Sequence, residues 1–503
     1  MSRLESMIVA VGNTLYSTNS HVLISGLKTV SGLVKCPLKS LQRSLPVYLR
    51  QVLDILKQVG ATESEVAQTS LKTLSTILRD GPAIDVKEKD LTFLLELVTP
   101  DLEEPSRQNP VFAILRAIVA RKFIVPEMYD IMDKVSEIMV TNQSPQVQEL
   151  CRSVLLQFLL EYPQGKGRLR SQMTFLTKNL SYEYESGRKS VMELLGAVVS
   201  KFQAGLVREY ADMLFIALVM VLANDDSTKC REIAAHLVKS LVLRLDDQKR
   251  TEMISYLHTW SSQHTQPALV RVSSQVYGLM IDSLQTNMSS FISSILADIR
   301  GSLEHSAKQF EDIDDDDSMD VDLEWQLPYH ALVALAKLIK VFPEIVTQPD
   351  GIAWELVVNH LLFPHAWVRI ASSRLLGTLF SSAPIQAPPT ADVDVPLYPL
   401  SSAGMREVAT KLCQQLKSEH LDDALSLQTV KNLFFIGRCY ASLPFTADST
   451  NDLVQEKEDL GDEEGNENVS SEQQNHPLPW MFSKLSYQTR SALIAKRNRS
   501  SAG

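Results

Sequence analysis

The chain has 503 residues, of which 45% are hydrophobic and 22% are charged, and its formal net charge is −11. Its apolar content is enough for a continuous core, whereas its five scattered cysteines contain no paired motif and exclude a disulfide framework. The chain start lacks the apolar centre of a signal peptide, and the longest apolar run, Met213 to Ala223, is too short to cross a bilayer and is expected in a buried first helix of a pair.

The first residues already belong to a helical repeat. Weak copies of the repeat lie near Val22, Val66 and Val111, and no polar capping segment of the kind that a solenoid needs precedes them. We therefore expect that Met1 is not the natural start of the folded array.

Further along the chain one helical pattern returns after about forty residues. Apolar residues fall at offsets 0, 3, 4, 7, 8 and 11 both from Val147 and from Val191. An α-helix has 3.6 residues per turn, so these positions form one broad apolar face. A shorter apolar helix precedes each of them, and such pairs bury their faces only by stacking on neighbours. The pattern predicts an all-α fold, an α-solenoid of roughly ten helix pairs.

An arginine marks the start of the second helix in four of the repeats. Arg188 and Arg231 are 43 residues apart, Arg271 follows 40 residues later, and Arg369 lies 98 residues further on. A Val-Arg pair followed by small and apolar residues at this period is typical of the HEAT repeat. We interpret the four arginines as a structural ladder, in which each bonds an acidic residue or a loop carbonyl of the next repeat. Ligand contact is the less favoured alternative, because the same slot recurs where no ligand need repeat.

Two acidic tracts and a proline-rich stretch interrupt the period. The first tract is centred on Asp314, Asp315, Asp316 and Asp317, and the second precedes the last predicted helix. Neither tract can bury enough apolar surface to order itself, so both are predicted to be disordered loops. The remainder of the chain is slightly basic, which permits contact with nucleic acid or basic proteins. Charge runs are also often solvated without a specific function, and this alternative stays open.

These interruptions define the predicted organisation of the chain. It comprises HEAT-repeat segments at 1–310, 325–380 and 404–446, acidic loops at 311–324 and 447–476, a proline-rich insertion at 381–403, and a terminal helix with a short basic tail at 477–503.

No catalytic motif is apparent. The stretch from Gln164 to Arg168 superficially resembles a phosphate loop, but it lacks the Walker spacing and a preceding strand, so we interpret it as a basic turn between helices. His360 and His365 have no third ligand nearby, and Pro364 lies between them, which argues against a metal site. We therefore predict a protein that is not an enzyme and that carries no metal or cofactor.

Three passages carry a more specific resemblance. Residues 175–202 contain Tyr-Glu-Tyr-Glu-Ser-Gly-Arg, residues 363–377 contain His-Ala-Trp-Val-Arg-Ile-Ala-Ser-Ser-Arg, and residues 477–487 read Pro-Leu-Pro-Trp-Met-Phe-Ser-Lys-Leu-Ser-Tyr. Together they resemble the C-terminal portion of the giant HEAT-repeat protein family of the small-subunit processome, also called the down-regulated-in-metastasis family. The similarity runs through nearly the whole chain.

The resemblance implies a nucleolar scaffold of the 90S pre-ribosome that supports maturation of the 18S rRNA and assembly of the small ribosomal subunit, without enzymatic activity. The implied partners are pre-rRNA, the small nucleolar ribonucleoprotein, processome assembly factors and ribosomal proteins, with no membrane and no small-molecule substrate. Members of this family are several times longer, and the basic tail expected of them is reduced here to Lys496, Arg497 and Arg499.

Candidate contacts with RNA or partners are few. Lys166, Arg168 and Arg170 are predicted to meet phosphates from an inter-helix turn. The tail cations Lys496, Arg497 and Arg499 are further candidate contacts with RNA or a partner. Trp367 beside Arg369 could stack on an unpaired base, but we favour the interpretation that Trp367 fills the gap between repeats.

A nuclear transport receptor of the karyopherin type, or another HEAT-repeat interaction scaffold, is the alternative function. A karyopherin is expected to have an acidic cargo surface along its inner helices, whereas the acids here lie in the loops, which counts against that reading. Fold analogy alone does not decide between these functions.

Overall fold

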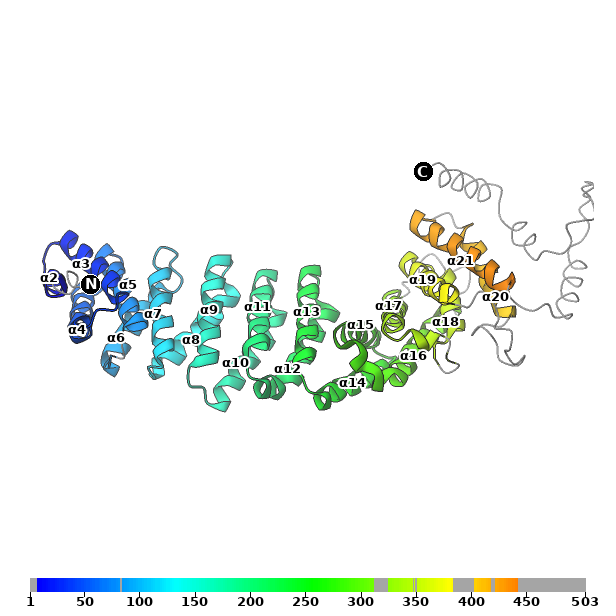
Figure 1. Ribbon diagram of the computed structural model, residues 1–503, viewed down its shortest axis with the longest axis horizontal. Helices are drawn as coiled ribbons and strands as arrows, with labels where there is room; N and C mark the ends of the chain where they lie inside the picture. Colours follow the sequence, from blue (N-terminus) through cyan, green and yellow to red (C-terminus); the bar gives the residue numbers. More distant parts are fainter. Residues whose placement is uncertain are drawn as a thin grey trace, which may run out of the picture. The chain divides into compact units, whose positions relative to one another are not determined.

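The computed structural model describes residues 7–81, 84–311, 324–346, 348, 351–382, 402–417 and 421–441. These residues form α-helices joined by short loops and 3₁₀ turns, and no strand occurs among them (Figure 1). They fall into two compact units, unit 1 (Met1–Arg250) and unit 2 (Thr251–Gly503). The predicted all-α, HEAT-type solenoid is confirmed.

Unit 1 is a stack of helix pairs in chain order. Its helices are α2 (Met7–Thr14), α3 (Ser20–Val34), α4 (Leu41–Val59), α5 (Glu65–Asp80), α6 (Glu88–Val98), α7 (Gln108–Arg121), α8 (Pro126–Thr141), α9 (Pro145–Glu161), α10 (Lys166–Lys178), α11 (Glu185–Lys201), α12 (Ala204–Asn224) and α13 (Thr228–Arg244), with 3₁₀ turns η1 (Thr99–Asp101) and η2 (Asn179–Ser181). The second helices, α3 to α13 with odd numbers, pack successively on one another and form one row.

The apolar faces predicted from the period lie in this row. In α9 and α11 the stripe residues from Val147 to Leu159 and from Val191 to Phe202 are buried, apart from the half-buried Leu150. Cys151 belongs to the same faces, and burial raises the pKa of its thiol to about 12. It therefore packs as a small apolar residue and stays protonated.

The longest apolar run of the sequence lies in α12, the first helix of its pair. Leu214 and Phe215 are buried, whereas Ile216 and Met220 are 44% and 47% exposed. One face of α12 is therefore buried against neighbouring helices, and the other face is partly exposed. Among the described helices, none combines the length and the apolar character needed to span a bilayer.

Unit 2 continues the same architecture with longer connections. After α14 (Asp247–Ser261), its helices are α15 (Pro267–Leu284), α16 (Ile292–Glu311), α17 (Gln326–Val341), α18 (Trp354–Asn359), α19 (Ala366–Ser382), α20 (Ser402–Gln415) and α21 (Asp423–Ala441), with 3₁₀ turns η3 (Gln285–Phe291), η4 (Pro343–Val346) and η5 (His360–Leu362). Here α15, α17, α19 and α21 pack successively on one another.

Several sequence predictions fall outside the described residues. They concern Asp314 to Asp317, most of the proline-rich insertion, the second acidic tract, and the tail cations Lys496, Arg497 and Arg499.

The proline-rich insertion was predicted at 381–403, which is too wide at both of its ends. Helix α19 continues through Ser382 because Leu379 and Phe380 extend its buried face, and α20 already begins at Ser402.

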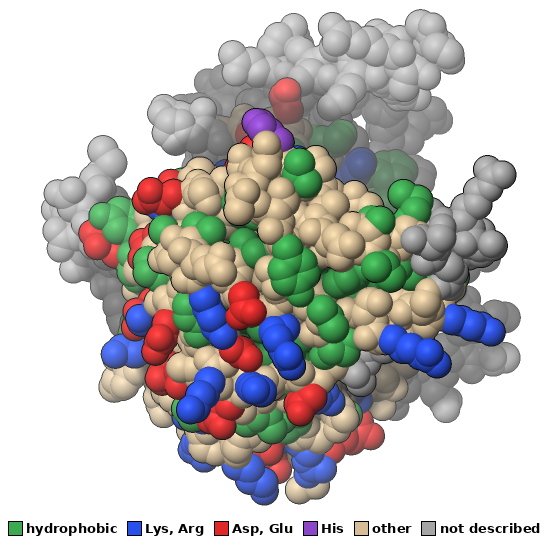
Figure 2. Space-filling view, turned by 90° about the vertical axis from the view of Figure 1, so that its left-hand side faces the viewer, with side chains coloured by type: hydrophobic (Ala, Val, Ile, Leu, Met, Phe, Trp, Pro, Cys, Tyr) green, Lys and Arg blue, Asp and Glu red, His purple; other side chains and the backbone are tan. Residues whose placement is uncertain are grey.

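The first helices of unit 1 leave apolar side chains in contact with solvent. Met7 and Val9 of α2 are 48% and 70% exposed, Tyr16 just after it is 62% exposed, and Val47 of α4 is 54% exposed. Figure 2 shows that hydrophobic side chains gather on this face of the molecule, beside Lys and Arg side chains. The region therefore offers an apolar surface in addition to its charged groups.

Candidate interaction surface

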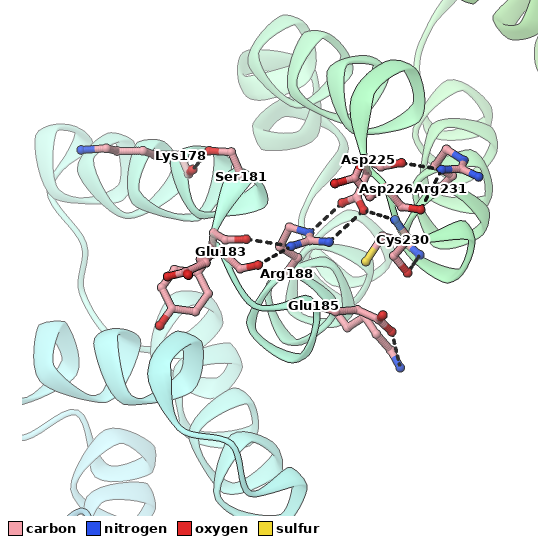
Figure 3. Close-up of polar contacts among 12 residues, drawn as sticks. Lys178, Ser181, Glu183, Glu185, Arg188, Asp225, Asp226, Cys230 and Arg231 are labelled. Atoms are coloured by element: carbon pink, nitrogen blue, oxygen red, sulfur yellow. Dashed lines mark hydrogen bonds and ion pairs between the residues drawn. The ribbon is translucent and has the colours of Figure 1, made fainter.

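The arginine slot holds the turn between the two helices of a repeat. Arg188 of α11 donates from Nη1 to the backbone carbonyls of Tyr182 and Glu183, at 2.9 and 3.0 Å (Figure 3). These carbonyls lie six and five residues before the arginine. The turn that precedes α11 would otherwise leave them without a partner in the helix, so the guanidinium satisfies them.

The same pattern occurs at Arg231 and Arg369. Each donates from Nη1 to the carbonyls six and five residues earlier, which belong to Asp225 and Asp226 for Arg231 and to Phe363 and Pro364 for Arg369. The predicted bonds to the next repeat are therefore replaced at these two positions by bonds to the arginine's own turn. A guanidinium offers five donors in a fixed fork, and the nearest unpaired acceptors lie in the adjacent turn.

Two of the arginines also reach the next repeat. Arg188 forms a bidentate ion pair with Asp225, with Nε–Oδ2 and Nη2–Oδ1 distances of 2.7 and 2.9 Å (Figure 3). The Asp225 side chain is only 4% exposed, and the pair raises the pKa of Arg188. Arg271 contacts Glu324 at 3.1 Å and Gln326 at 2.8 Å, just before and at the start of α17.

Glutamine, which the arginine pattern does not predict, fills the slot in the earlier repeats. The Nε2 amides of Gln68, Gln108 and Gln148 each donate to the carbonyl six residues earlier, at 2.6, 3.0 and 2.8 Å. The three glutamines and Arg188 are spaced by 40 residues. That constant spacing was the available signal, but a search for arginine alone does not detect it.

The basic cluster of Lys166, Arg168 and Arg170 lies on α10 and not on a turn. Helix α10 begins at Lys166 with Gly165 as its N-cap, so all three side chains project from its first turns. The prediction of a turn was wrong because cations at a helix N-terminus oppose the helix dipole and do not signal a start. Lys166 and Arg170 are exposed.

Arg168 is held by an aromatic ring. Its guanidinium carbon lies 4.0 Å from the ring centroid of Tyr129, and the two side chains line a small pocket with Asp133, Gln164 and Gln172. Burial raises the pKa of Asp133, and Arg168 acts in the opposite direction. All three cations of this basic cluster are exposed, and Arg168 in addition packs on the Tyr129 ring.

Four aromatic rings meet where α17 and α19 begin; we call them the aromatic cluster. Trp325 and His365 stack in parallel with centroids 3.8 Å apart, and Trp367 stands at 89° to Trp325 at 5.3 Å. Tyr329 contacts Trp367 at 5.7 Å. Trp367 therefore packs against the preceding repeat, but it is 55% exposed, so it fills the gap between repeats only in part. Its inner side packs on α17 and its outer side faces solvent.

The histidines near the cluster are committed to other contacts. His360 is buried and its ring nitrogens lie 2.7 Å from the carbonyl of Leu356 and 3.2 Å from the hydroxyl of Ser306. His365 stacks on Trp325, and burial together with Arg369 lowers its pKa. The described parts of the chain contain no group of three His, Cys, Asp or Glu side chains placed to hold a metal ion.

Two known proteins are similar to this chain in sequence over most of its length. The chain is 32% identical over 448 residues to the U3 small nucleolar RNA-associated protein 20 of Schizosaccharomyces pombe, and 31% identical over 436 residues to the protein of the same name of Saccharomyces cerevisiae. The predicted family resemblance is confirmed. The chain is homologous to a part of these proteins. The alignments cover 89% and 86% of the chain but only 18% and 17% of the two relatives.

No family model matches the chain. Among solved structures, a chain of a Kap95p–RanGDP structure has a TM-score of 0.43 at 11% identity. The alignment covers 90% of this chain and 54% of that chain. An importin beta structure has a TM-score of 0.42 at 13% identity, with 91% and 55% coverage. Likeness at this level does not distinguish between functions.

Proposed function

We propose that the chain acts as a non-enzymatic scaffold of the small-subunit processome, in the nucleolus, and supports processing of pre-rRNA to 18S rRNA. The observation that carries this proposal is the homology over 89% of the chain to a protein named for its association with the U3 small nucleolar RNA. The proposed partners are pre-rRNA, the small nucleolar ribonucleoprotein, assembly factors and ribosomal proteins.

The use of polar groups in the repeats is consistent with a scaffold. The residues of the recurring slot, such as Arg231 and Gln148, bond the carbonyls of the turn before their own helix. They stabilise the helix pairs and leave the exposed helix faces and loops for partners. Solenoids of this kind bind through such extended surfaces.

Phosphate contacts are proposed for the exposed cations of α10. Lys166 and Arg170 project from the first turns of this helix, whose backbone N–H groups and dipole also favour an anion. No acidic residue lies in the first turn. Each such contact releases counterions from RNA, so binding would depend on salt.

Sedimentation tests the scaffold proposal. A tagged full chain, expressed in cells with intact pre-rRNA, is expected to co-migrate with large pre-ribosomal particles in a gradient, and ribonuclease treatment is expected to shift it toward the top. A chain that stays at the top with intact pre-rRNA present would show that the proposal is wrong.

The cations of α10 are tested separately on the purified chain. Lys166→Ala with Arg170→Ala is expected to weaken RNA binding and to reduce the slope of log affinity against log salt by about one per lost contact. Lys87→Ala with Lys89→Ala is the matched control, because it removes the same charge from exposed positions near the start of α6. If the two double variants weakened RNA binding equally, the proposed phosphate contacts of α10 would be wrong, and its cations would contribute only nonspecific charge.

A further inference from the structure

The outer face of Trp367 is an aromatic platform that is fixed in place. Trp325 at 5.3 Å and Tyr329 at 5.7 Å support its inner side, and Trp325 is itself stacked on His365 at an interplanar angle of 3°. With 55% of its surface exposed, Trp367 keeps much of its ring open to a ligand. Because its neighbours already restrict the indole, the side chain of Trp367 would lose little additional conformational entropy when a ligand stacks on it.

Within the described parts of the chain, no cation covers this platform. The Tyr129 ring in unit 1 is covered by the Arg168 guanidinium at 4.0 Å, whereas none of the described cations lies over Trp367. The nearby Arg369 donates to the carbonyls of Phe363 and Pro364, so its guanidinium bonds the turn that precedes α19. The open ring face is therefore available to a partner from outside the chain.

The second helices around the cluster are strongly basic. Helices α15, α17 and α19 carry five Lys and Arg residues and a single carboxylate, Asp282, which forms an ion pair with Lys337 at 2.8 Å. Outside these helices, Glu324 contacts Arg271 at 3.1 Å, and Asp422 acts on the pKa of Arg369 against the lowering by burial. The surface beside the platform thus attracts a polyanion and repels a cationic partner.

One cation stands in register with the platform. Arg374 follows Trp367 by seven residues, which places it on the same face of α19 about 10 Å further along the helix axis. Its side chain is exposed, and its guanidinium has no hydrogen bond or ion pair among the described residues, whereas its backbone carbonyl accepts from the Thr378 hydroxyl. A stacked base and a phosphate one or two nucleotides away would span this distance.

We propose that the aromatic cluster and Arg374 bind single-stranded RNA, with an unpaired base stacked on Trp367 and a backbone phosphate on Arg374. The inference rests on the proposed function for the presence of pre-rRNA, and it specifies that the RNA contacted here is unpaired. Duplex RNA presents no free base face to an indole, so the site selects single strands. An acidic peptide would meet the same positive charge, but it lacks the flat rings that an open aromatic face prefers.

The test measures binding of the purified full chain to a fluorescent single-stranded RNA of about twelve nucleotides and to its duplex. Trp367→Ala is expected to weaken single-strand affinity by about ten-fold, Trp367→Phe to keep most of it, and neither to change duplex affinity. Phe434→Ala is the matched control, because Phe434 is an aromatic residue of α21 that is 65% exposed outside the cluster.

Arg374→Ala provides a second measurement that does not disturb the rings. It is expected to weaken single-strand binding several-fold and to reduce the salt slope by about one, with an unchanged melting temperature. A 2-aminopurine base in the same RNA is expected to be quenched by the wild-type chain and by Arg374→Ala, but not by Trp367→Ala.

The inference is overturned if Trp367→Ala binds single strands as the wild type does, or if Phe434→Ala weakens binding equally. It is also overturned if Trp367→Ala loses a protein partner from ribonuclease-treated particles while its RNA affinity is unchanged. Failure of the proposed function gives a different result: the wild-type chain would not sediment with pre-ribosomal particles, yet its single-strand binding would still depend on Trp367.

Discussion

The turns before the second helices are bonded by a side chain in both unit 1 and unit 2, but unit 2 adds the aromatic cluster to two of them. In unit 1 a glutamine or arginine recurs every 40 residues and bonds the turn before its own helix, as at Gln148 and Arg188. In unit 2 Arg369 bonds its own turn in the same way, and Arg271 reaches residues 53 and 55 positions later. The turns that begin α17 and α19 also carry the partly exposed rings of Trp325 and Trp367. In both units a side-chain donor in the slot bonds the turn, and the partly exposed aromatic rings of unit 2 are an addition to this bond.

The largest expected effect concerns the buried ion pair of unit 1. Asp225→Ala leaves Arg188 with a 14% exposed side chain and no carboxylate, and is expected to lower the free energy of unfolding by about 3 to 5 kcal/mol. Hydrogen exchange at the amides of α11 and α13 measures it. Asp226→Ala is the control, since Asp226 is exposed and offers Arg231 only its backbone carbonyl. Equal losses in both variants would contradict the assigned role of the pair.

The second prediction separates the two units by their response to acid. His305, His330, His360 and His365 all lie in unit 2 and have lowered pKa values, and burial is the largest cause for each. For His330 the pKa is lowered to about 4. The unfolded chain therefore binds a proton that the folded chain rejects, so stability is lost as pH falls from about 6.5 to about 4.

His330 alone is expected to account for up to about 3 kcal/mol of this loss. Tryptophan fluorescence during denaturation follows it selectively, because the described tryptophans all lie in unit 2. His330→Gln is expected to flatten the pH dependence of this signal. A variant that keeps the full wild-type dependence would exclude His330 as its source.

A smaller effect is expected where glutamine holds the turn. Gln148→Ala leaves the carbonyl of Asn142 without its side-chain donor and is expected to cost about 1 to 2 kcal/mol. Gln146→Ala, two residues earlier and exposed, is expected to change the melting temperature little. If Gln148→Ala behaved like Gln146→Ala in thermal unfolding followed by circular dichroism, the turn bond would contribute nothing measurable.

The smallest expected effect tests whether the slot accepts either residue. Arg231→Gln is expected to change stability by less than about 1 kcal/mol, because a glutamine at the equivalent position in α5, α7 and α9 already bonds the carbonyl six residues earlier. Arg188→Gln is expected to cost more, since it also removes the ion pair with Asp225. Equal melting temperatures for the two variants would show that the ion pair with Asp225 adds nothing measurable to the stability of the Arg188 slot.

The helical repeat was predictable from the sequence, whereas the side-chain roles were predictable only in part. Apolar residues at helical spacing predicted α9 and α11, because helix periodicity depends on neighbours within two turns. The start of α10 was missed because Lys166 to Arg170 carry no start signal, and the glutamine slot was missed because amides are common and unmarked.

The sequence by itself determined the fold class, the period and the family resemblance, since each depends on local spacing or on direct identity of residues. Only the tertiary structure decided which partner each side chain takes. It placed the Arg231 guanidinium on its own turn, Arg168 over Tyr129, and Trp367 against Trp325 with its outer face open. The physical reason is that rotamers and the packing of adjacent helices select between partners at similar distances. Arg168 and Tyr129 are 39 positions apart in the chain, and Trp367 and Trp325 are 42 positions apart, so no local pattern records these pairs.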